Sequence, residues 1–430
     1  MNYSERLNNV IPGGAHTYSR GDDQYPENAP HLFEKGSGAY LYTPEGKKYL
    51  DYGMALRAVT LGYAENSVAD AAIKQIYNGN NLTRPSLIEL EAAELMTKLF
   101  PSVEMVKFAK NGSTVTTAAL KVARAYTGRN YIARCTQHPF FSYDDWFIGD
   151  TTLTRGIPKE HVVFTLNFNY NDIHSLQTLF EEYPNQIAGV ILEPATSAHP
   201  ENKFLHQVKD LCKKNGTVFI LDEMITGFRW HLSGAQVYYD IEPDLCTFGK
   251  GMANGFSVSA LGGKREIMSV GGIKEEGSER VFLISTTHGA EMCGLGAFIE
   301  TINFYKAHNV IEHLWTYGKK LIDGMNSLAR EAGVENYIEA VGIPCSPNYS
   351  TKDKNGEISL GLRTLFSQEM INNGVLMPWI ALSYAHGDTE LQQTLEAVKK
   401  SLSVYSKGID DGYEKYLKGS VIKPVFRKFN

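Results

Sequence analysis

The sequence predicts an α/β fold built around a large central domain. At 430 residues the chain can bury a large apolar core and form two or three structural units. In the middle of the chain, short apolar runs alternate with longer stretches that have the apolar spacing of helices. The two chain ends lack this alternation. Such a pattern favours a mostly parallel sheet covered by helices, with a separate small α+β unit formed by both ends.

Five short apolar runs are the expected strands of the central sheet. Each has the length and the enrichment in apolar residues that are typical of a buried strand. They lie at residues 106–109, 131–133, 188–192, 218–221 and 245–248. The intervening segments carry helical periodicity, which predicts crossover connections between parallel strands.

The chain ends indicate the second, smaller domain. Residues 39–52 read as a hairpin whose turn contains Pro44 and Gly46. Near the other end, a long helical pattern at 310–333 precedes strand-like pieces and a basic tail. We expect residues 1–50 and 301–430 to form the small domain, and residues 51–300 to form the large one.

Composition excludes several classes of function. The net charge of -6 is spread without a basic stripe, so a nucleic-acid partner is not expected. The five cysteines include no C-x-x-C pair, which predicts neither a metal site nor a disulfide framework and suits a reducing cytoplasm. The first residues are too polar for a signal peptide, and no run is long enough to span a membrane.

The segment at 217–229 places two carboxylates at a functional position. Four apolar residues lead into Asp222 and Glu223, so both acids follow a buried strand at its carboxyl end, where open α/β sheets bind ligands. An aspartate that caps a turn is the plain interpretation. The magnesium-binding acid of a nucleotide hydrolase is another, although the chain contains no G-x-x-x-x-G-K-[ST] loop.

Lys250 follows the next expected strand and has glycine on both sides. Gly249 and Gly251 allow backbone and ligand to approach the lysine closely. Desolvation and a neighbouring cation lower the pKa of such an amine, which frees it to form an imine with an aldehyde. A surface lysine in a glycine-rich turn is the alternative.

A third segment has the features of a phosphate site. An apolar strand stops at Asn111, and Gly112 and Ser113 then begin a stretch with helical spacing. Free N–H groups and the helix dipole favour an anion at such a helix N-terminus. Asparagine and serine are also ordinary N-caps, so this segment alone does not distinguish a ligand site from a plain helix start.

Taken together, these segments resemble the class III aminotransferases, which have the type I fold of pyridoxal phosphate (PLP) enzymes. The resemblance rests on NGST at 111–114, ILEP at 191–194, LDEMITGFR at 221–229, Lys250 and STTHG at 285–289. It is most similar to the glutamate-1-semialdehyde aminomutase branch, through IPGGAHTYSR at 11–20, YLYTPEGKKYLDY at 40–52, ALGGKREIM at 260–268 and LSYAHGD at 382–388.

The resemblance implies PLP as the cofactor and two catalytic residues. Lys250 matches the family's Schiff-base lysine, and Asp222 matches the acid that pairs with the pyridine nitrogen. A ring kept protonated in this way accepts the electrons that remain when the substrate loses a proton. The freed Lys250 amine would then carry that proton between substrate and cofactor.

The resemblance also assigns positions around the cofactor. Asn111, Gly112 and Ser113 match the phosphate-binding turn, and Thr286 matches a threonine that reaches the phosphate of the neighbouring subunit, which implies a homodimer. Phe140 falls where the family stacks an aromatic ring on the cofactor, and Met224 should press on the other face.

Two of these positions keep an alternative. Phe140 could pack in the core instead, since the alignment around 138–146 could slip by one residue. Arg20 matches an arginine that binds the substrate carboxylate, and its fork of donors suits that ligand. A solvent-exposed arginine in a glycine-rich loop is the alternative there.

Several positions depart from the aminomutase pattern. The serine-glycine-threonine-glutamate of the family is Asn111-Gly112-Ser113-Thr114 here, and its tyrosine-histidine-glycine is Phe140-Phe141-Ser142. Leu56, followed by Arg57, stands where the family has tryptophan, and Pro378 stands where it has a pocket glutamate. These departures remove polar groups from the substrate side and leave the cofactor positions intact.

The sequence therefore predicts an aminotransferase that moves an amino group from a small-molecule donor such as glutamate to an aldehyde or ketone, for example a sugar-type or phosphorylated metabolite. One alternative is glutamate-1-semialdehyde 2,1-aminomutase itself. Alternatives from another class are a non-PLP nucleotide hydrolase and a catalytically silent binding protein. The absence of a G-x-x-x-x-G-K-[ST] loop argues against the hydrolase. The presence of Lys250 and Asp222 argues against the silent protein.

Overall fold

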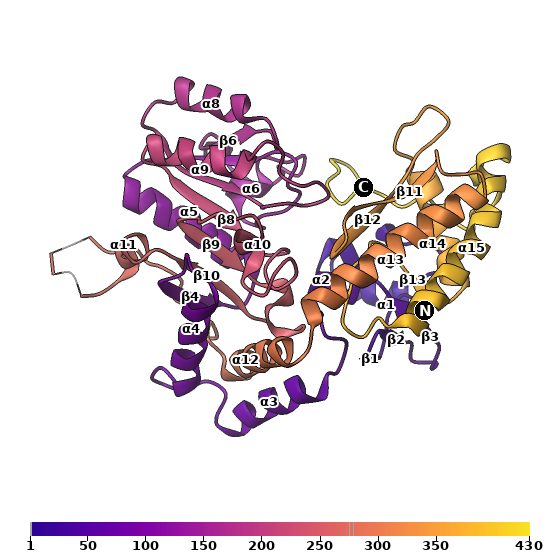
Figure 1. The fold of residues 1–430 in the computed structure, drawn as a ribbon, viewed down its shortest axis with the longest axis horizontal. Coiled ribbons are helices and arrows are strands. Elements are labelled where there is room, and N and C mark those ends of the chain that lie inside the picture. The colour runs from indigo at the N-terminus through magenta and orange to yellow at the C-terminus, as the bar shows by residue number, and fades with distance from the viewer. Residues whose placement is uncertain (1, 275, 278) are drawn as a thin grey trace. The chain divides into compact units, whose positions relative to one another are not determined.

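The computed structural model describes residues 2–274, 276–277 and 279–430. The chain folds into two compact units (Figure 1). The first unit combines Met1–Glu65 with Glu312–Asn430, and the second is the continuous stretch Asn66–Ile311. The first unit is thus built from both chain ends.

The second unit is organised around a seven-stranded sheet. Its strands lie in the order β4-β10-β9-β8-β7-β5-β6, and β10 runs antiparallel to both of its neighbours while the other pairs are parallel. The strands are β4 (Met105–Ala109), β5 (Tyr131–Cys135), β6 (Thr165–Phe168), β7 (Ile187–Leu192), β8 (Val218–Asp222), β9 (Leu245–Phe248) and β10 (Ser259–Gly263). The expected α/β fold with a mostly parallel mixed sheet is confirmed.

All five expected strands occur in this sheet, and the sequence interpretation missed two others. β10 contains two glycines and a single large apolar residue, Leu261, so it gives no apolar run. β6 is four residues long and carries Asn167 on its exposed side. Both missed strands pair with expected ones, which shows that hydrogen bonding to the existing sheet decides their conformation.

Helices surround this sheet. They are α3 (Asn66–Tyr77), α4 (Leu87–Leu99), α5 (Gly112–Thr127), α6 (Asp145–Ile148), α7 (Lys159–Val162), α8 (Ile173–Glu182), α9 (Phe204–Lys214), α10 (Gly234–Tyr238), α11 (Arg265–Met268) and α12 (Met292–Ala307), with short 3-10 turns η3 (Lys250–Ala253) and η4 (Ser269–Gly271). Helix α5 packs against β7, β9 and β10. The residues that the sequence placed on its apolar side are buried, namely Val115, Ala118, Ala119, Val122 and Ala123.

The first unit contains a four-stranded sheet in the order β1-β2-β3-β13 and a separate hairpin. The strands are β1 (Lys35–Ser37), β2 (Tyr40–Tyr42), β3 (Lys48–Asp51), β13 (Val375–Leu376), and the hairpin pair β11 (Ile338–Ile343) and β12 (Ser346–Thr351). The hairpin expected around Pro44 and Gly46 is confirmed as β2 and β3. β13 then adds to β3 in parallel, which joins the two chain ends in one sheet.

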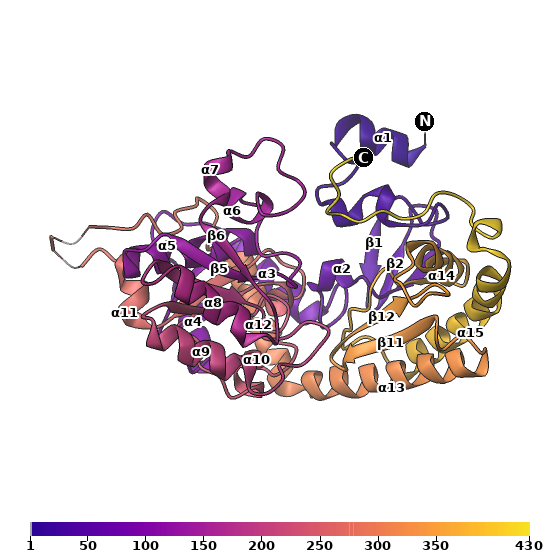
Figure 2. The same cartoon turned by 90° about the horizontal axis from the view of Figure 1, so that it is seen from above.

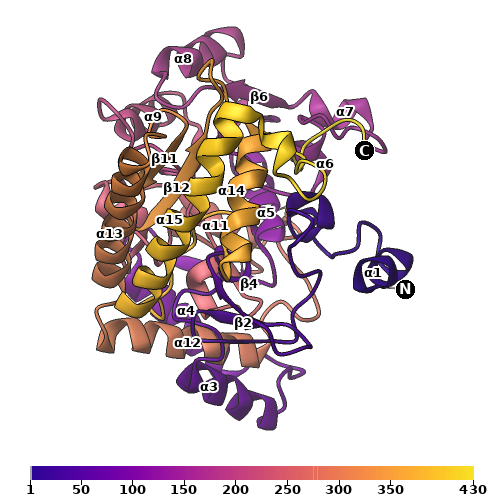
Figure 3. The same ribbon diagram turned by 90° about the vertical axis from the view of Figure 1, so that its right-hand side faces the viewer.

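Long helices complete the first unit. They are α13 (Val310–Glu331), which begins two residues before the unit does, α14 (Leu360–Asn372) and α15 (Asp388–Asp411), with the shorter α1 (Tyr3–Val10), α2 (Met54–Arg57), η1 (Tyr18–Arg20), η2 (Asp22–Gln24) and η5 (Tyr413–Lys415). Figure 3 shows α14 beside α15, and the two helices pack along their length. Helix α13 matches the long helix expected at 310–333.

The first unit extends further along the chain than residues 1–50. Residues 51–65 belong to it because they are hydrogen-bonded to its C-terminal part: the Tyr52 N–H donates to the Leu376 carbonyl at 2.8 Å, and the Tyr384 N–H donates to the Thr60 carbonyl at 2.7 Å. Within the described part of the chain, no helix is both long and apolar enough to cross a membrane. All five cysteines are free thiols.

Candidate active site

The carboxyl ends of two neighbouring strands bring Asp222 and Lys250 to one edge of the sheet in the second unit. Asp222 is the last residue of β8, and Lys250 follows the end of β9 after the single residue Gly249. β8 and β9 are parallel neighbours, so residues that follow them emerge at the same edge. The positive charge of Lys250 acts on the Asp222 carboxyl and lowers its pKa.

Asp222 is buried, so the charged form of its carboxyl needs a cationic partner. The side chain is 2 % exposed, and this burial raises the pKa of Asp222 above its ordinary value. Two donors work in the opposite direction by bonding the carboxylate: the Thr247 hydroxyl at 2.8 Å and the Met224 N–H at 2.9 Å, both to Oδ1. A cation placed against this carboxylate would hold it ionised.

The N-terminus of α5 forms the second part of the site. Asn111 is its N-cap, and the side-chain oxygen of Asn111 accepts the Thr114 N–H at 3.0 Å. The Ser113 hydroxyl accepts the Tyr143 N–H at 3.0 Å, which ties the turn to the segment after β5. Helix α5 has 16 residues, so its dipole favours an anion at Gly112 and Ser113.

Met224 occupies the space between the helix turn and the lysine loop. A Cβ on Gly249 would lie 2.3 Å from the Met224 sulfur, and a Cβ on Gly112 would lie 3.0 Å from it. A Cβ on either glycine would therefore displace the end of this one flexible side chain. Met224 links the turn that carries Gly112 to the loop that carries Lys250.

These residues fit a PLP molecule. The buried carboxylate of Asp222 suits a protonated ring nitrogen, the start of α5 suits a phosphate, and Lys250 suits an aldehyde. When bound, PLP supplies a ring that stores the electron pair left by a deprotonated substrate. Asp222 would hold the proton on the ring nitrogen, and the Lys250 Nζ would accept and return the substrate proton.

In the aromatic segment after β5, two neighbouring phenylalanines differ in their exposure. Phe140 is 50 % exposed and meets Phe147 edge to face, with ring centroids 5.7 Å apart. Phe141 is buried, and its ring packs against Trp146 and Phe147. Of the two, Phe140 is the more exposed, as a residue that stacks on a cofactor requires.

Thr286 is exposed and lies in a stretch without regular secondary structure, 281–288, in which Leu283 is buried. Its carbonyl accepts the Gly289 N–H at 3.2 Å, and a Cβ on Gly289 would lie 2.5 Å from the Thr286 hydroxyl oxygen. Asn81 holds the same stretch by donating to the Thr287 carbonyl at 3.0 Å. The threonine is therefore displayed on the surface of the second unit.

Arg20 belongs to the first unit, where it ends the 3-10 turn η1 and is exposed. Burial raises the pKa of Tyr25 to about 12 and raises that of Tyr63 as well, while the positive charge of Arg20 lowers both. Arg20 is thus close enough to both phenols to act on them. The Tyr63 hydroxyl also donates to the buried Asp51 carboxylate at 2.7 Å.

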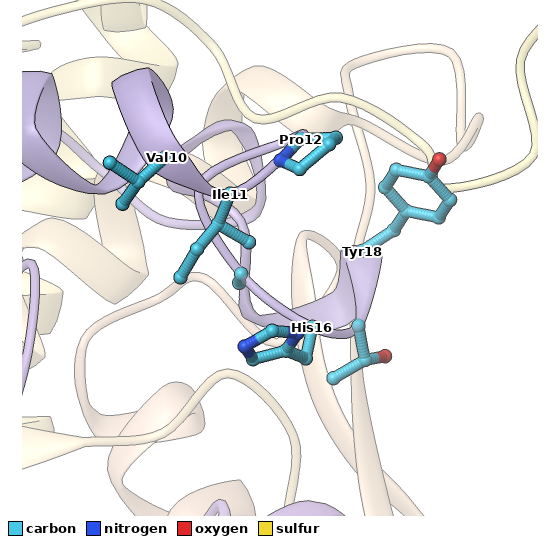
Figure 4. Close-up of a pocket in the computed structure, with 7 residues that line it drawn as sticks. Val10, Ile11, Pro12, His16 and Tyr18 are labelled. Atoms are coloured by element: carbon cyan, nitrogen blue, oxygen red, sulfur yellow. The ribbon is translucent and has the colours of Figure 1, made fainter.

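A cavity of about 310 Å³ lies on the loop that leads to Arg20 (Figure 4). Its walls come from one short stretch of chain. The lining residues are Val10, Ile11, Pro12, Ala15, His16, Thr17 and Tyr18. Tyr18 is 66 % exposed, so the cavity opens at the surface of this loop. It contains none of the residues that the sequence assigned to the substrate or the cofactor.

Two of the departures from the aminomutase pattern, at Leu56 with Arg57 and at Pro378, lie within the first unit. Residues 54–57 all have positive φ, between 39° and 69°, and the carboxylate of Asp51 holds the start of this segment through the N–H groups of Gly53 and Met54. The Arg57 guanidinium donates to the Ile380 carbonyl at 2.9 Å, and the Trp379 indole donates to the Gly53 carbonyl at 3.2 Å.

Four consecutive left-handed residues cost several kcal/mol, at about 1–3 kcal/mol each. The structure keeps them because the Asp51 carboxylate and the 377–381 segment fix them from two sides. Leu56 and Pro378 therefore belong to one braced region of the first unit.

Sequence reasoning missed Thr247, which is part of the Asp222 site. The two residues are paired in register on β8 and β9, so the Thr247 hydroxyl is adjacent to the carboxylate. A threonine inside the otherwise apolar run LCTF was the available signal. The parallel pairing that gives it meaning becomes visible only in the folded sheet.

Comparison with known proteins identifies the family. The family model of the class-III aminotransferases matches residues 23–380. Glutamate-1-semialdehyde 2,1-aminomutase of Francisella philomiragia subsp. philomiragia is 31 % identical over 91 % of this chain and 94 % of its own length. The 3-aminobutyryl-CoA aminotransferase of Cloacimonas acidaminovorans is 31 % identical over 95 % of this chain and 97 % of its own.

Solved structures show the same fold. The FumI protein of Sphingopyxis sp. MTA144, solved as its PLP internal aldimine form, superimposes with a TM-score of 0.86 at 25 % identity, covering 95 % of this chain and 96 % of that one. An omega-transaminase from Sphaerobacter thermophilus gives a TM-score of 0.84 at 25 % identity, with 94 % and 97 % of the two chains covered. The chain belongs to the class-III aminotransferases, enzymes of PLP fold type I that use PLP to move amino groups.

Proposed function

We propose that this enzyme transfers an amino group between two molecules, from a donor such as glutamate to a separate aldehyde or ketone, for example a sugar-type or phosphorylated metabolite. Within the second unit, the observation that carries amino transfer is the pairing of a buried Asp222 carboxylate with Lys250 at adjacent strand ends. The donor and acceptor are small molecules.

The choice of transferase over mutase rests on the first unit. The left-handed segment 54–57 and the segment 377–381 carry two of the departures from the aminomutase, and hydrogen bonds from Arg57 and Trp379 hold the two segments together. Sequence changes in both of these hydrogen-bonded segments favour a substrate different from that of the aminomutase. The chain is as similar to an aminobutyryl-CoA aminotransferase as to a glutamate-1-semialdehyde 2,1-aminomutase, so the comparisons are compatible with either reaction.

The roles of the individual residues belong to this proposal. Lys250 binds the cofactor and moves the proton, and Asp222 holds the ring nitrogen. The phosphate is bound by Asn111, Gly112 and Ser113, with Thr286 contributed across a homodimer. Phe140 and Met224 cover the two faces of the ring, and Arg20 binds the substrate carboxylate. Five free thiols fit a cytoplasmic location.

The dimer has support in the surface of the second unit. Large apolar side chains are exposed there, among them Tyr77 at 87 % on α3 and Phe282 at 74 % in the stretch that carries Thr286. A contiguous apolar patch marks an interaction surface, and we infer that these side chains belong to one. A homodimer that covers them would bring Thr286 to a neighbouring site.

The experiment that tests the function starts from the protein loaded with its amino group. The loaded protein is mixed with a panel of keto and aldehyde metabolites, and the return of the cofactor's aldehyde-form absorbance is recorded. A transferase needs a second amino compound for every further turnover, whereas an aminomutase converts glutamate 1-semialdehyde without one. Sustained conversion of that single substrate would overturn the proposal.

Lys250→Ala tests the mechanism. We expect the variant to fold normally and to lose turnover by several orders of magnitude, because no other amine follows β9 to accept the substrate proton. Circular dichroism checks the fold, and borohydride reduction followed by peptide mapping checks that cofactor is trapped on Lys250 of the unmodified protein. A variant with substantial remaining turnover would remove Lys250 from the mechanism.

A further inference from the structure

The last residues of the chain return to the segment that carries Arg20. After α15, residues 416–427 run without regular secondary structure, and we refer to them as the C-terminal strap. Figure 2 shows the C-terminal trace passing beside the N-terminal segment of the same unit. Hydrogen bonds fasten the strap at two places.

The first half of the strap is fastened to α14. The Gln368 side chain donates to the Tyr416 carbonyl at 3.0 Å and accepts the Lys418 N–H at 2.8 Å. Further along, the Ile422 N–H donates to the Thr364 hydroxyl oxygen at 3.1 Å. The strap is therefore anchored on a helix whose inner side is buried.

The second half of the strap is fastened to η2. The Lys423 N–H donates to the Asp23 carbonyl at 2.9 Å, and the Gln24 side chain donates to the Lys423 carbonyl at 3.0 Å. The Arg427 guanidinium pairs with the Asp23 carboxylate at 2.5 Å. Their side chains are 24 % and 34 % exposed, so water screens this ion pair only in part.

The segment around Arg20 depends on such tethers. It consists of the two short turns η1 and η2 joined by Gly21, and none of the residues in these turns is buried. Asp22 binds Ser4, Asn8 and His31 on one side, while Asp23 faces the strap. Because η2 follows Arg20 after one residue, the strap restrains the backbone that aims the Arg20 side chain.

We propose that Arg427 and Asp23 are positioning residues for Arg20, so that the C-terminal strap sets the affinity for the substrate carboxylate. This inference rests on the proposed role of Arg20. The cofactor residues belong to the second unit, and the hydrogen bonds and the ion pair that fasten the strap go to residues of the first. Loosening the strap should therefore weaken substrate binding and leave the cofactor bound.

The test uses the full-length holoenzyme and an amino donor that carries a carboxylate, such as glutamate. Arg427→Gln and Asp23→Asn should each raise KM about fivefold with kcat changed less than about twofold, because each removes the same partly exposed ion pair. Arg427→Lys should restore part of the affinity. Lys428→Gln is the matched control, since it removes the neighbouring charge, whose side chain lies over the Phe429 ring.

Hydrogen exchange gives a readout that needs no substrate. The amides of residues 17–25 should exchange faster in Arg427→Gln and Asp23→Asn than in the parent protein or in Lys428→Gln. The double variant should add little to either single change, because both remove one interaction. Unchanged exchange and KM in Arg427→Gln would overturn the role of the strap.

Arg20→Gln separates this inference from the proposed function. Arg20→Gln should raise KM at least as much as Arg427→Gln does. Adding Arg427→Gln to the Arg20→Gln variant should raise KM no further. If Arg20→Gln raises KM while Arg427→Gln does not, only the strap is overturned. If Arg20→Gln leaves KM unchanged, Arg20 does not bind the substrate. If Arg427→Gln still raises KM when added to Arg20→Gln, the strap does not act through Arg20 and the inference is wrong.

Discussion

At the scale of single residues, the acid and the amine of the site could be predicted because both follow apolar runs in the sequence. Asp222 and Lys250 lie where the sequence placed them, at the ends of β8 and β9. Thr247 could not be predicted, because its contact with Asp222 depends on the register between two parallel strands. The threonine in the apolar run LCTF is a local signal, but it does not say which residue lies opposite it in the sheet.

Thr247→Val should weaken cofactor binding about tenfold. The hydroxyl donates to the Asp222 carboxylate at 2.8 Å, and a hydrogen bond to a buried charge contributes about 1.5–3 kcal/mol. Its loss raises the pKa of Asp222, which burial already raises, so the carboxyl becomes protonated at a higher pH. The affinity for PLP should then begin to fall at a higher pH as the solution is acidified.

Titration of the PLP dissociation constant against pH in Thr247→Val, Thr247→Ser and the parent protein measures this effect. Thr247→Ser keeps the donor and should behave like the parent. An identical pH profile for the valine variant would show that the hydroxyl does not control the protonation of Asp222.

At the scale of elements, periodicity identified the strands and helices that pack through their own side chains, such as α5 and β8. It missed β10, which contains two glycines and becomes a strand because β4 and β9 bond to its backbone on both sides. The left-handed segment 54–57 was also beyond prediction, since tethers from distant parts of the chain impose its positive φ angles.

Gly249→Ala tests how tightly the elements of the site are fitted. A Cβ there would lie 2.3 Å from the Met224 sulfur, so either Met224 or the Lys250 loop must move. We expect the variant to bind PLP at least tenfold more weakly, a cost typical of such crowding at about 1–3 kcal/mol. PLP affinity measured by absorbance checks it.

Met224→Ala provides the control for this crowding. Combined with Gly249→Ala, it should recover much of the lost affinity, because it removes the atoms that the new Cβ would meet. A double variant that binds PLP more weakly than either single variant would contradict the steric explanation.

At the scale of the whole molecule, the proposed homodimer makes a prediction that no single subunit can fulfil. Thr286→Glu places a negative charge where the partner's phosphate should bind, and Lys250→Ala removes the covalent attachment. Each variant alone should trap no cofactor with borohydride. Mixed and allowed to exchange subunits, they should trap cofactor on Lys250 in about a quarter of the sites, since random pairing makes half of the dimers mixed.

Trapping quantified by mass spectrometry decides the outcome, with each unmixed variant as control. In a mixed dimer, the Thr286 from one subunit meets the Lys250 of the other. If no cofactor is trapped after mixing, Thr286 binds the phosphate of its own subunit or none at all, and the proposal of a shared site is wrong.

The pairing of β3 with β13 also fixes the order in which the protein can mature during synthesis. The Leu50 N–H needs the Gly374 carbonyl and the Tyr52 N–H needs the Leu376 carbonyl, so the earliest residues wait for the translation of more than three hundred others. Residues 66–311 have no such delay and can fold as soon as they leave the ribosome. In a nascent chain stalled shortly after residue 311 has left the ribosome, residues 66–311 should therefore resist protease. The N-terminal residues that precede them should still be cleaved.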